Sequence, residues 1–449
     1  MQFLQSLSAP VSSVSLGIFR ISFGALILLS TIRFIALGWI EEQIIKPKIH
    51  FQYYGFEWIT VPSAFYVYIL YSVLIIASFC VMIGYKYRIM SVLLFLAFTY
   101  TELWDISYYL NHYYAVSLCS FLLCFLPAHC IFSVDSTSKP SIYQALIPRY
   151  YILLLQFQIA IIYLYAGIAK IQYDWLIEAL PLSLWLPSHG DMPIIGNVLS
   201  ARWTAYVFSW FGMLYDCTIP LFLSIQTTRI YAYIAVICFH TITGILFQIG
   251  VFPLVMIVLT LIFFPPEQLL QIINRTLTVF NTSVKVRADI TKYTSFSIHP
   301  IIYGSLIAYC LFQLLFPFRY VLYPGNVFWT EQGYRFGWRV MLIEKSGYTQ
   351  FTIKDSLTGK KGIIDNAEWL TDHQEKQMSM QPDLIVQFAH TLSTYYQKNG
   401  YTHPIITADS WITLNGRKSY RFIDPSINLA SINDSWFHKE WILSEGVSK

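Results

Sequence analysis

The chain is poor in charged residues. Only 12% of its 449 residues are charged, whereas 56% are hydrophobic and 18% are aromatic. Soluble domains usually carry about 25% charged residues, so this composition excludes an ordinary soluble protein and predicts a polytopic membrane protein. The net charge of +4 is spread along the chain, which does not indicate nucleic-acid binding.

Motifs of several well-known site types are absent. The sequence has no glycine-rich phosphate loop, no G-x-S-x-G and no histidine pair at metal-ligand spacing. No two cysteines form a C-x-x-C motif, and no cysteine follows Cys310, so the polar C-terminal part has no disulfide of its own. We therefore predict no metal site, and we expect the cysteines to be small buried hydrophobic residues. The seven are Cys80, Cys119, Cys124, Cys130, Cys217, Cys238 and Cys310.

Apolar segments long enough to span a bilayer, or nearly so, recur through the first 325 residues. The first is too long for the core of a signal peptide and lacks a clear small-residue cleavage site, so we expect it to be a membrane helix. The sequence thus predicts a helical membrane bundle of about nine spans. They lie near 14–37, 64–84, 89–106, 113–132, 150–170, 203–225, 230–248, 250–266 and 300–322.

The distribution of Lys and Arg predicts an orientation. With a cytoplasmic N-terminus, most Lys and Arg of the short connections fall on the cytoplasmic side, as the positive-inside rule requires. The opposite side then receives the 38–63 loop, the Asn111-His112 turn, the 171–202 loop and the C-terminal region. We expect a bacterial cytoplasmic-membrane protein with its C-terminal domain periplasmic or extracellular, or an ER membrane protein if the source is eukaryotic.

Near Pro317 the composition becomes mixed and turn-rich. We predict two domains: a membrane-embedded helical domain at 1–322 that carries the site, and an α+β domain outside the membrane at 323–449. Its predicted elements are a hairpin of strands 339–343 and 348–354 around the turn 345–347, helices at 372–380 and 383–397, and strands at 405–414 and 420–423 around Asn415-Gly416.

Lys170 is the most conspicuous residue of the membrane domain. It ends an apolar segment, where an ammonium group deep in a bilayer costs about 2.5 to 3.5 kcal/mol. At helical spacing it shares one face with Tyr163, Gly167 and Asp174. One interpretation is a lysine that reaches the membrane surface and pairs with Asp174. The other is a partly buried amine that acts as a base, with Gly167 leaving room for a flat ligand.

Two further stretches carry polar groups between or within spans. Asn111-His112, surrounded by tyrosines, offers hydrogen bonds to a carbonyl or quinone oxygen, or is an interfacial pair in an aromatic belt. His240 lies within a span, as a functional group or a helix-to-helix hydrogen bond. Gly250 and Pro253 predict a break or a re-entrant turn after it. Asp216 is another intramembrane carboxylate, and we considered Arg20 or Arg33 as its partner.

Together these stretches resemble the vitamin K-dependent γ-carboxylase family and related bacterial membrane proteins. The resemblance is collinear over most of the chain and rests on four motifs. They are Tyr165-Ala166-Gly167-Ile168-Ala169-Lys170 with Asp174-Trp175, Leu110-Asn111-His112-Tyr113, His240 with Phe247-Gln248-Ile249-Gly250-Val251-Phe252-Pro253, and Phe336-Gly337-Trp338-Arg339-Val340-Met341-Leu342.

The resemblance implies a mechanism. In the family, a lysine deprotonates vitamin K hydroquinone, whose reaction with dioxygen produces a base able to remove a γ-proton from glutamate. Carbon dioxide then adds, which leaves γ-carboxyglutamate and vitamin K epoxide. Lys170 matches the catalytic lysine, and Asn111, His112, Gly167 and His240 are the expected quinone-binding residues. The implied cofactor is a menaquinol- or phylloquinol-type hydroquinone, and the implied partners are a glutamate-containing peptide and membrane lipid.

The chain also departs from the animal members of the family. They carry two adjacent lysines where this chain has Ala169 before Lys170, a longer polar domain, and a disulfide that joins this domain to the bundle. We therefore expect a bacterial member with a different substrate. The alternatives are a quinone epoxidase without efficient carboxylation, a transporter or lipid-binding protein that uses Lys170, Asp216 and His240, and a haem or quinone electron carrier that uses His112 and His240.

Overall fold

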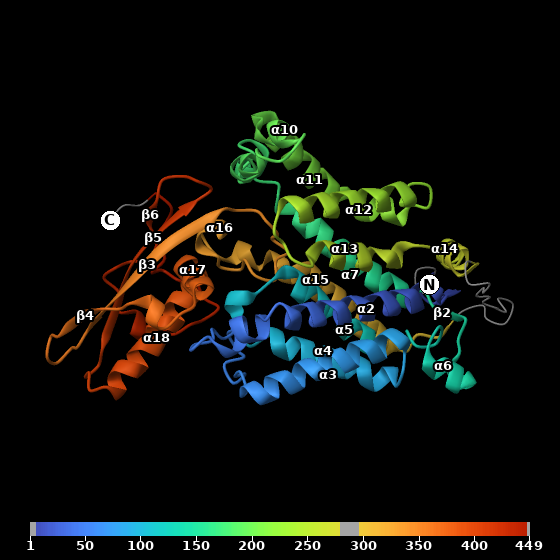
Figure 1. Ribbon diagram of the computed structural model, residues 1–449, viewed down its shortest axis with the longest axis horizontal. Coiled ribbons are helices and arrows are strands. Elements are labelled where there is room, and N and C mark those ends of the chain that lie inside the picture. Colours follow the sequence, from blue (N-terminus) through green and yellow to red (C-terminus); the bar gives the residue numbers. More distant parts are fainter. Residues whose placement is uncertain (1–5, 279–295, 447–449) are drawn as a thin grey trace.

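The computed structural model describes residues 6–278 and 296–446. Long helices run side by side along one axis of the molecule, and the C-terminal α+β region lies at one end of them (Figure 1). The strand β2 (Leu146–Pro148) and the helix α14 (Pro266–Thr278) lie at the opposite end. The predicted helical membrane bundle followed by a C-terminal region with a sheet is therefore confirmed in outline.

The bundle consists of ten helices within the described ranges. They are α2 (Val14–Ala36), α3 (Ala64–Ile83), α4 (Tyr87–Glu102), α5 (Asn111–Phe125), α7 (Tyr150–Ile168), α11 (Arg202–Ser224), α12 (Arg229–Leu246), α13 (Phe252–Leu259), α14 (Pro266–Thr278) and α15 (Pro300–Leu315). Shorter helices are α6 (Val134–Ser138), α8 (Tyr173–Leu176), α9 (Leu182–Trp185), α10 (Gly196–Ser200) and α16 (Val327–Thr330). The strands β1 (Pro10–Ser12) and β2 (Leu146–Pro148) pair near the N-terminus.

The number of spans differs from the prediction. Among the described residues, six helices are long and apolar enough to cross a membrane: α2, α3, α7, α11, α12 and α15 with its 3-10 extension to Leu322. A seventh would be α13 with α14, but this pair is bent by 117°. The helices α4 and α5 contain only 16 and 15 residues. The count of nine is thus not confirmed, because the segments at 89–106, 113–132 and 250–266 form short or broken helices.

The bundle is packed through helical apolar stripes and close approaches. On α2, Leu16, Phe19 and Phe23 are fully buried, and their spacing of three and four residues places them on one face. The opposite face exposes apolar Ile32, as suits a lipid-facing surface. At Gly24 an added Cβ would lie 2.6 Å from a backbone atom of α3, so only glycine permits this contact between the two helices.

The C-terminal region contains a four-stranded antiparallel sheet in the order β4-β3-β5-β6. The central strands, β3 (Lys345–Lys354) and β5 (Ile405–Leu414), pair along their whole length, and β4 (Lys361–Ile363) and β6 (Tyr420–Arg421) lie at the edges. The helices α17 (Asp372–Met380) and α18 (Pro382–Lys398) complete the domain. The predicted stripe of α18, Leu384, Phe388 and Leu392, is fully buried.

Several predictions for this domain are confirmed and one is wrong. Both helices, β5 and the turn at Asn415-Gly416, whose two φ angles are positive, lie where the sequence placed them. The hairpin around 345–347 is wrong, because those residues begin β3 and pair with β5. Residues 339–343 form no strand, since Met341 has a φ of +53° and the segment is irregular.

Bundle loops contribute to the core of the C-terminal domain. Phe51, Tyr53 and Ile106 are buried in the same apolar cluster as the sheet and α18. Gln374 of α17 donates to the Asp105 carboxylate at 2.8 Å. The Asn111 amide also donates to the Arg339 carbonyl. The 38–63 loop and the Asn111-His112 turn therefore lie beside the C-terminal domain, as expected. The domain boundary at 322 and the assignment of this end to the outside stay predictions.

All seven cysteines are free thiols. Cys80, Cys119 and Cys130 are buried as expected, whereas Cys238 is exposed on α12.

Candidate functional site

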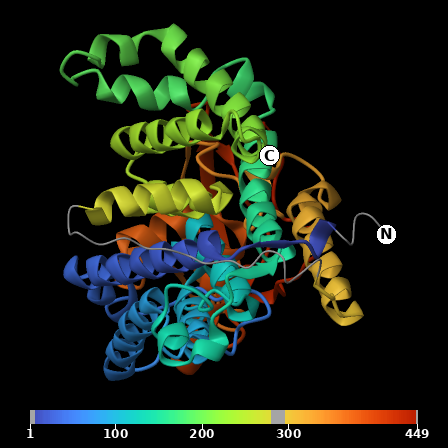
Figure 2. The same cartoon turned by 90° about the vertical axis from the view of Figure 1, so that its right-hand side faces the viewer.

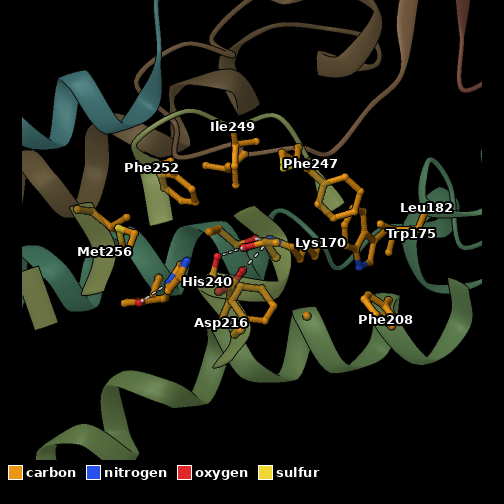
Figure 3. A pocket seen from close by; sticks show the side chains of 18 of the residues that line it. Lys170, Trp175, Leu182, Phe208, Asp216, His240, Phe247, Ile249, Phe252 and Met256 are labelled. Carbon is orange, nitrogen blue, oxygen red and sulfur yellow. Dashed lines mark hydrogen bonds and ion pairs between the residues drawn. The ribbon is translucent and has the colours of Figure 1, made fainter. Parts of the chain in front are cut away.

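A cavity lies between α7, α11, α12 and α13, near the end of the bundle that carries the C-terminal domain (Figure 3). It encloses about 730 Å³ of empty space, including its open part. Most of its lining is apolar or aromatic. The lining residues are Ile162, Tyr163, Ala166, Lys170, Trp175, Leu182, Trp185, Phe208, Gly212, Asp216, Phe239, His240, Thr243, Phe247, Ile249, Phe252, Met256, Val340 and Met341.

Lys170 lies at the polar part of this cavity, just beyond the last residue of α7. Its side chain is 8% exposed. Its Nζ donates to the Asp216 carboxylate at 2.7 Å and to the Ala166 carbonyl at 3.1 Å, and it lies 5.4 Å from the ring centre of Trp175. Figure 3 shows Lys170 and Asp216 pointing toward each other. A buried ion pair is therefore placed at the wall of an apolar cavity.

The expected partner of Lys170 is wrong. Because α7 ends at Ile168 and the chain turns before α8, Asp174 does not continue the face of Lys170. Asp174 instead accepts two hydrogen bonds from Arg417 of the C-terminal domain, at 2.6 and 2.7 Å, and one from Asn415 at 2.7 Å. Burial opposes the charge on Asp174, but these donors outweigh it and hold the pKa of Asp174 below its usual value.

The suggested partners of Asp216 are also wrong. Arg20 donates to the Phe132 carbonyl at 2.6 Å, and Arg33 lies 4.8 Å from the ring centre of Trp39. Asp216 lies on α11, one turn before Pro220, and points into the cavity toward Lys170. The sequence shows an intramembrane carboxylate at this position, but its pairing depends on how α7 and α11 pack.

His240 lies in the cavity wall on α12 and is 1% exposed. Its Nε2 is 2.9 Å from the hydroxyl of Tyr163 on α7. Its Nδ1 is buried and has no hydrogen-bond partner among the described residues. One nitrogen is thus fixed by the protein and the other is free to bind a ligand.

The expectation that Gly167 leaves room for a flat ligand is wrong. An added Cβ would lie 2.6 Å from the sulfur and 2.7 Å from the backbone nitrogen of Cys217. Gly167 therefore permits α7 to approach α11 closely, and this approach brings Lys170 and Asp216 together. It positions the ion pair through helix packing rather than through contact with a ligand.

Asn111 and His112 lie behind the cavity wall. The Asn111 amide donates to the Arg339 carbonyl at 2.9 Å, immediately before the lining residues Val340 and Met341. His112 is buried, and the centre of its ring lies 5.9 Å from that of Phe252. The ring centre of Phe252 lies 5.7 Å from that of His240. The two residues therefore support the wall, and neither belongs to the cavity lining.

Several site residues lacked a signal in the sequence. Tyr163 was recognised only as a member of the Lys170 face, and its contact with His240 joins helices 77 residues apart. Val340 and Met341 close the cavity from the C-terminal region, although their pattern indicated a strand. Among the described residues, no group of three or more His, Cys, Asp or Glu side chains is arranged to hold a metal ion.

Comparison with known families agrees with this architecture. Residues 8–267 match the HTTM domain. This range contains the bundle helices from α2 to α13 and the residues that they contribute to the cavity around Lys170, whereas α15 lies outside it. The chain is thus an integral membrane protein of the HTTM class.

Residues 298–447 match the lumenal domain of vitamin K-dependent gamma-carboxylase. The two matches follow one another in chain order, and the chain belongs to the vitamin K-dependent γ-carboxylase family. No solved structure matches the chain significantly.

Proposed function

We propose that the protein carboxylates peptide glutamate to γ-carboxyglutamate in a vitamin K hydroquinone-dependent reaction coupled to quinone epoxidation. Lys170 is the base that deprotonates the hydroquinone. The observation that carries the proposal is the Lys170–Asp216 pair, buried at 2.7 Å in the wall of an apolar cavity. The membership of the chain in the γ-carboxylase family supports the same reaction class.

The lining of the cavity suits a hydroquinone. Aromatic side chains of Trp175, Trp185, Phe208 and Phe252 offer flat apolar surfaces for a ring and its hydrocarbon chain. The unpartnered Nδ1 of His240 supplies a buried hydrogen-bonding group. When bound, the hydroquinone supplies the reducing equivalents and, with dioxygen, the strong base that abstracts the γ-proton of glutamate.

In this proposal Lys170 reacts as the neutral amine, after its ammonium group has released a proton, and its Nζ accepts the hydroxyl proton, which restores the ammonium group of the ion pair. Asp216 accepts a hydrogen bond from the same nitrogen, so the carboxylate stabilises the ammonium group that results. His240, held through Nε2 by Tyr163, presents Nδ1 to the ring oxygen and orients it. The apolar walls exclude water, which protects the strong base from protonation by solvent.

The glutamate side chain would reach the cavity from the end that carries the C-terminal domain. Val340 and Met341 belong to that region and line the cavity, so a peptide bound to the domain can approach the ring without crossing the bundle. Carbon dioxide and dioxygen are small and apolar, and we expect them to enter from the lipid.

The test uses the purified full chain in lipid nanodiscs with menaquinol or phylloquinol, a glutamate-containing peptide and labelled carbon dioxide. The wild type should form epoxide, measured by chromatography, and label the peptide. Lys170→Ala should lose both activities while it remains folded by circular dichroism. Epoxide formation by Lys170→Ala at the wild-type rate would show that another group is the base.

The same assay separates the alternative functions. Epoxide without label identifies an epoxidase that does not carboxylate efficiently. Failure of the wild type to form any epoxide with either quinol would contradict the proposal and favour a transporter or lipid-binding protein.

A further inference from the structure

A second hollow lies between the end of the bundle and the C-terminal domain. It encloses about 1440 Å³, including its open part. Tyr114 and Leu118 of α5 and Phe312 of α15 line it from the bundle, and Phe336 and Trp436 line it from the C-terminal region. It shares no lining residue with the Lys170 cavity. We call this hollow the lateral groove.

The lateral groove lies beside lipid-facing surface. The span of α15 is only 11% buried within the protein, and α15 lies at the margin of the bundle (Figure 2). On this helix the groove residue Phe312 is 52% exposed and the neighbouring Leu315 is 66% exposed. Beyond its end, Leu322 and the groove residue Phe437 are about four-fifths exposed, at 80% and 82%. Exposed aromatic and aliphatic groups near the end of a span are typical of the membrane interface.

The three carboxylates of the lateral groove are all paired with cations, and one of these cations, Lys345, lies outside the lining. Arg335 pairs with Asp383 at 2.5 Å, Lys439 pairs with Asp434, and Glu331 pairs with Lys345 at 2.9 Å. These three acids are the only carboxylates in the lining, so each already has a cationic partner.

Arg319 is the cation of the lateral groove that has no acid partner within the described parts of the chain. It donates to the backbone carbonyls of Phe316, at 3.2 Å, and Arg335. Its guanidinium group lies 4.3 Å from the ring centre of Phe316. Arg339 interacts electrostatically with Arg319 but is not a lining residue of the groove; it is 5% exposed, and its Nε and Nη1 have no acceptor among the described residues. Arg319 therefore carries a positive charge that no carboxylate of the groove neutralises, so an anion can bind there.

We propose that the lateral groove binds an anionic phospholipid, with the phosphate against Arg319 and an acyl chain along Leu118, Phe312 and Phe316. An arginine fork binds phosphate oxygens through charge-assisted hydrogen bonds. The apolar residues of α5 and α15 can pack against a hydrocarbon chain. A lipid has such a chain, whereas a free phosphate or a peptide carboxylate does not. Because both regions of the chain line the groove, the bound lipid bridges the bundle and the C-terminal domain.

The test titrates phosphatidylglycerol and phosphatidylcholine into the delipidated full chain in detergent and counts bound lipid by native mass spectrometry. We expect phosphatidylglycerol to bind at least about 10-fold tighter than phosphatidylcholine. Arg319→Gln should weaken phosphatidylglycerol about 10- to 100-fold, the usual effect of a lost charge-assisted hydrogen bond. Arg319→Lys should keep most of the preference, because it keeps the charge.

Lys439→Gln is the matched control, because it removes a cation of the same groove that already has an acid partner. It should leave the preference unchanged. A phosphatidylglycerol with a photoreactive acyl chain should also label peptides that contain Leu118 or Phe312 in the wild type, which does not depend on any variant.

Three results would overturn the proposal. They are equal affinity for the two lipids, unchanged binding to a folded Arg319→Gln protein, and displacement of the lipid by inorganic phosphate or a glutamate-containing peptide at comparable concentration. Photolabelling confined to other segments would overturn it as well, even if Arg319→Gln fails to fold.

Discussion

Lys170 of the bundle and Lys345 of the C-terminal domain have nearly the same immediate surroundings. The two residues are 6% and 8% exposed. Each Nζ donates to a carboxylate, at 2.7 Å to Asp216 and at 2.9 Å to Glu331. Each also donates to a backbone carbonyl, at 3.1 and 2.9 Å, and each lies over an aromatic ring, 5.4 and 4.9 Å from its centre.

The two lysines differ in whether they line a cavity. Lys170 lines an apolar cavity among membrane helices. Lys345 begins β3 and lines none of the four described cavities. Burial lowers the pKa of Lys345, against the opposing effect of Glu331. Burial and pairing are therefore alike at the two lysines, and what separates them is that Lys170 lines a cavity. We propose that this access to a cavity gives Lys170 its role as a base.

The largest expected effect is that of Lys170→Met on turnover. Loss of a general base typically lowers the rate by about 10²- to 10⁴-fold, and we expect epoxide formation to fall within that range. Methionine fits a cavity wall of apolar groups, so circular dichroism should show unchanged helix content, although the loss of the partner of Asp216 should lower the unfolding free energy as in Lys345→Met. If Lys170→Met retained more than a tenth of the wild-type rate, Lys170 would not be the base.

Lys345→Met should mainly affect stability. It leaves Glu331 buried without its partner, which typically costs about 3–5 kcal/mol of unfolding free energy. Thermal unfolding should show the C-terminal domain melting earlier, while turnover per folded molecule stays within a few-fold of the wild type. A selective loss of turnover with unchanged melting would assign Lys345 a direct role in the reaction.

Asp216→Asn removes the negative charge beside Lys170 and so tests the pairing of these two residues. We expect kcat to fall about 10- to 100-fold, corresponding to a lost charge-assisted hydrogen bond, with a smaller change in KM for the quinol. Asp174→Asn is the matched control, because Asp174 is close to Lys170 in sequence but contacts Arg417 instead. If Asp174→Asn lowers kcat as much as Asp216→Asn, the assigned pairing is wrong.

The smallest expected effect concerns the contact between Asp174 and Arg417, which joins the bundle to the C-terminal domain. Because the pKa of Asp174 is lowered in the folded protein, its contribution to stability is present above about pH 3.9, its unfolded value. That contribution is lost as the pH falls through the folded value. We expect about 1 kcal/mol, since the pair is partly exposed.

Melting curves between pH 6 and pH 3 check this prediction. The wild type should lose more stability on acidification than Arg417→Ala, in which the contact is already absent. An identical pH dependence in the two proteins would show that this contact does not stabilise the folded state.

The sequence predicted the parts of the fold that follow from local patterns. The stripe Leu384, Phe388 and Leu392 and the Asn415-Gly416 turn specify their elements through periodicity and backbone preference, and both were found as expected. The apolar run 339–343 indicated a strand, but Val340 and Met341 are apolar because they line a cavity. A local pattern does not distinguish these two reasons for hydrophobicity.

The site was predictable only in part for a similar reason. Lys170 and His240 were recognised because polar groups are costly within spans. The partner of Lys170 depends on the end of α7 at Ile168 and on the close approach that Gly167 permits to α11. Both are properties of tertiary packing, so spacing along the chain indicated Asp174 instead of Asp216.

The most direct test of the account measures the incorporation of labelled carbon dioxide into a glutamate-containing peptide. Equal amounts of folded wild type, Lys170→Met and Lys345→Met are compared in the presence of quinol and dioxygen. We predict that the wild type and Lys345→Met label the peptide and that Lys170→Met does not. Labelling by Lys170→Met at the wild-type rate would contradict the assignment of Lys170 as the base.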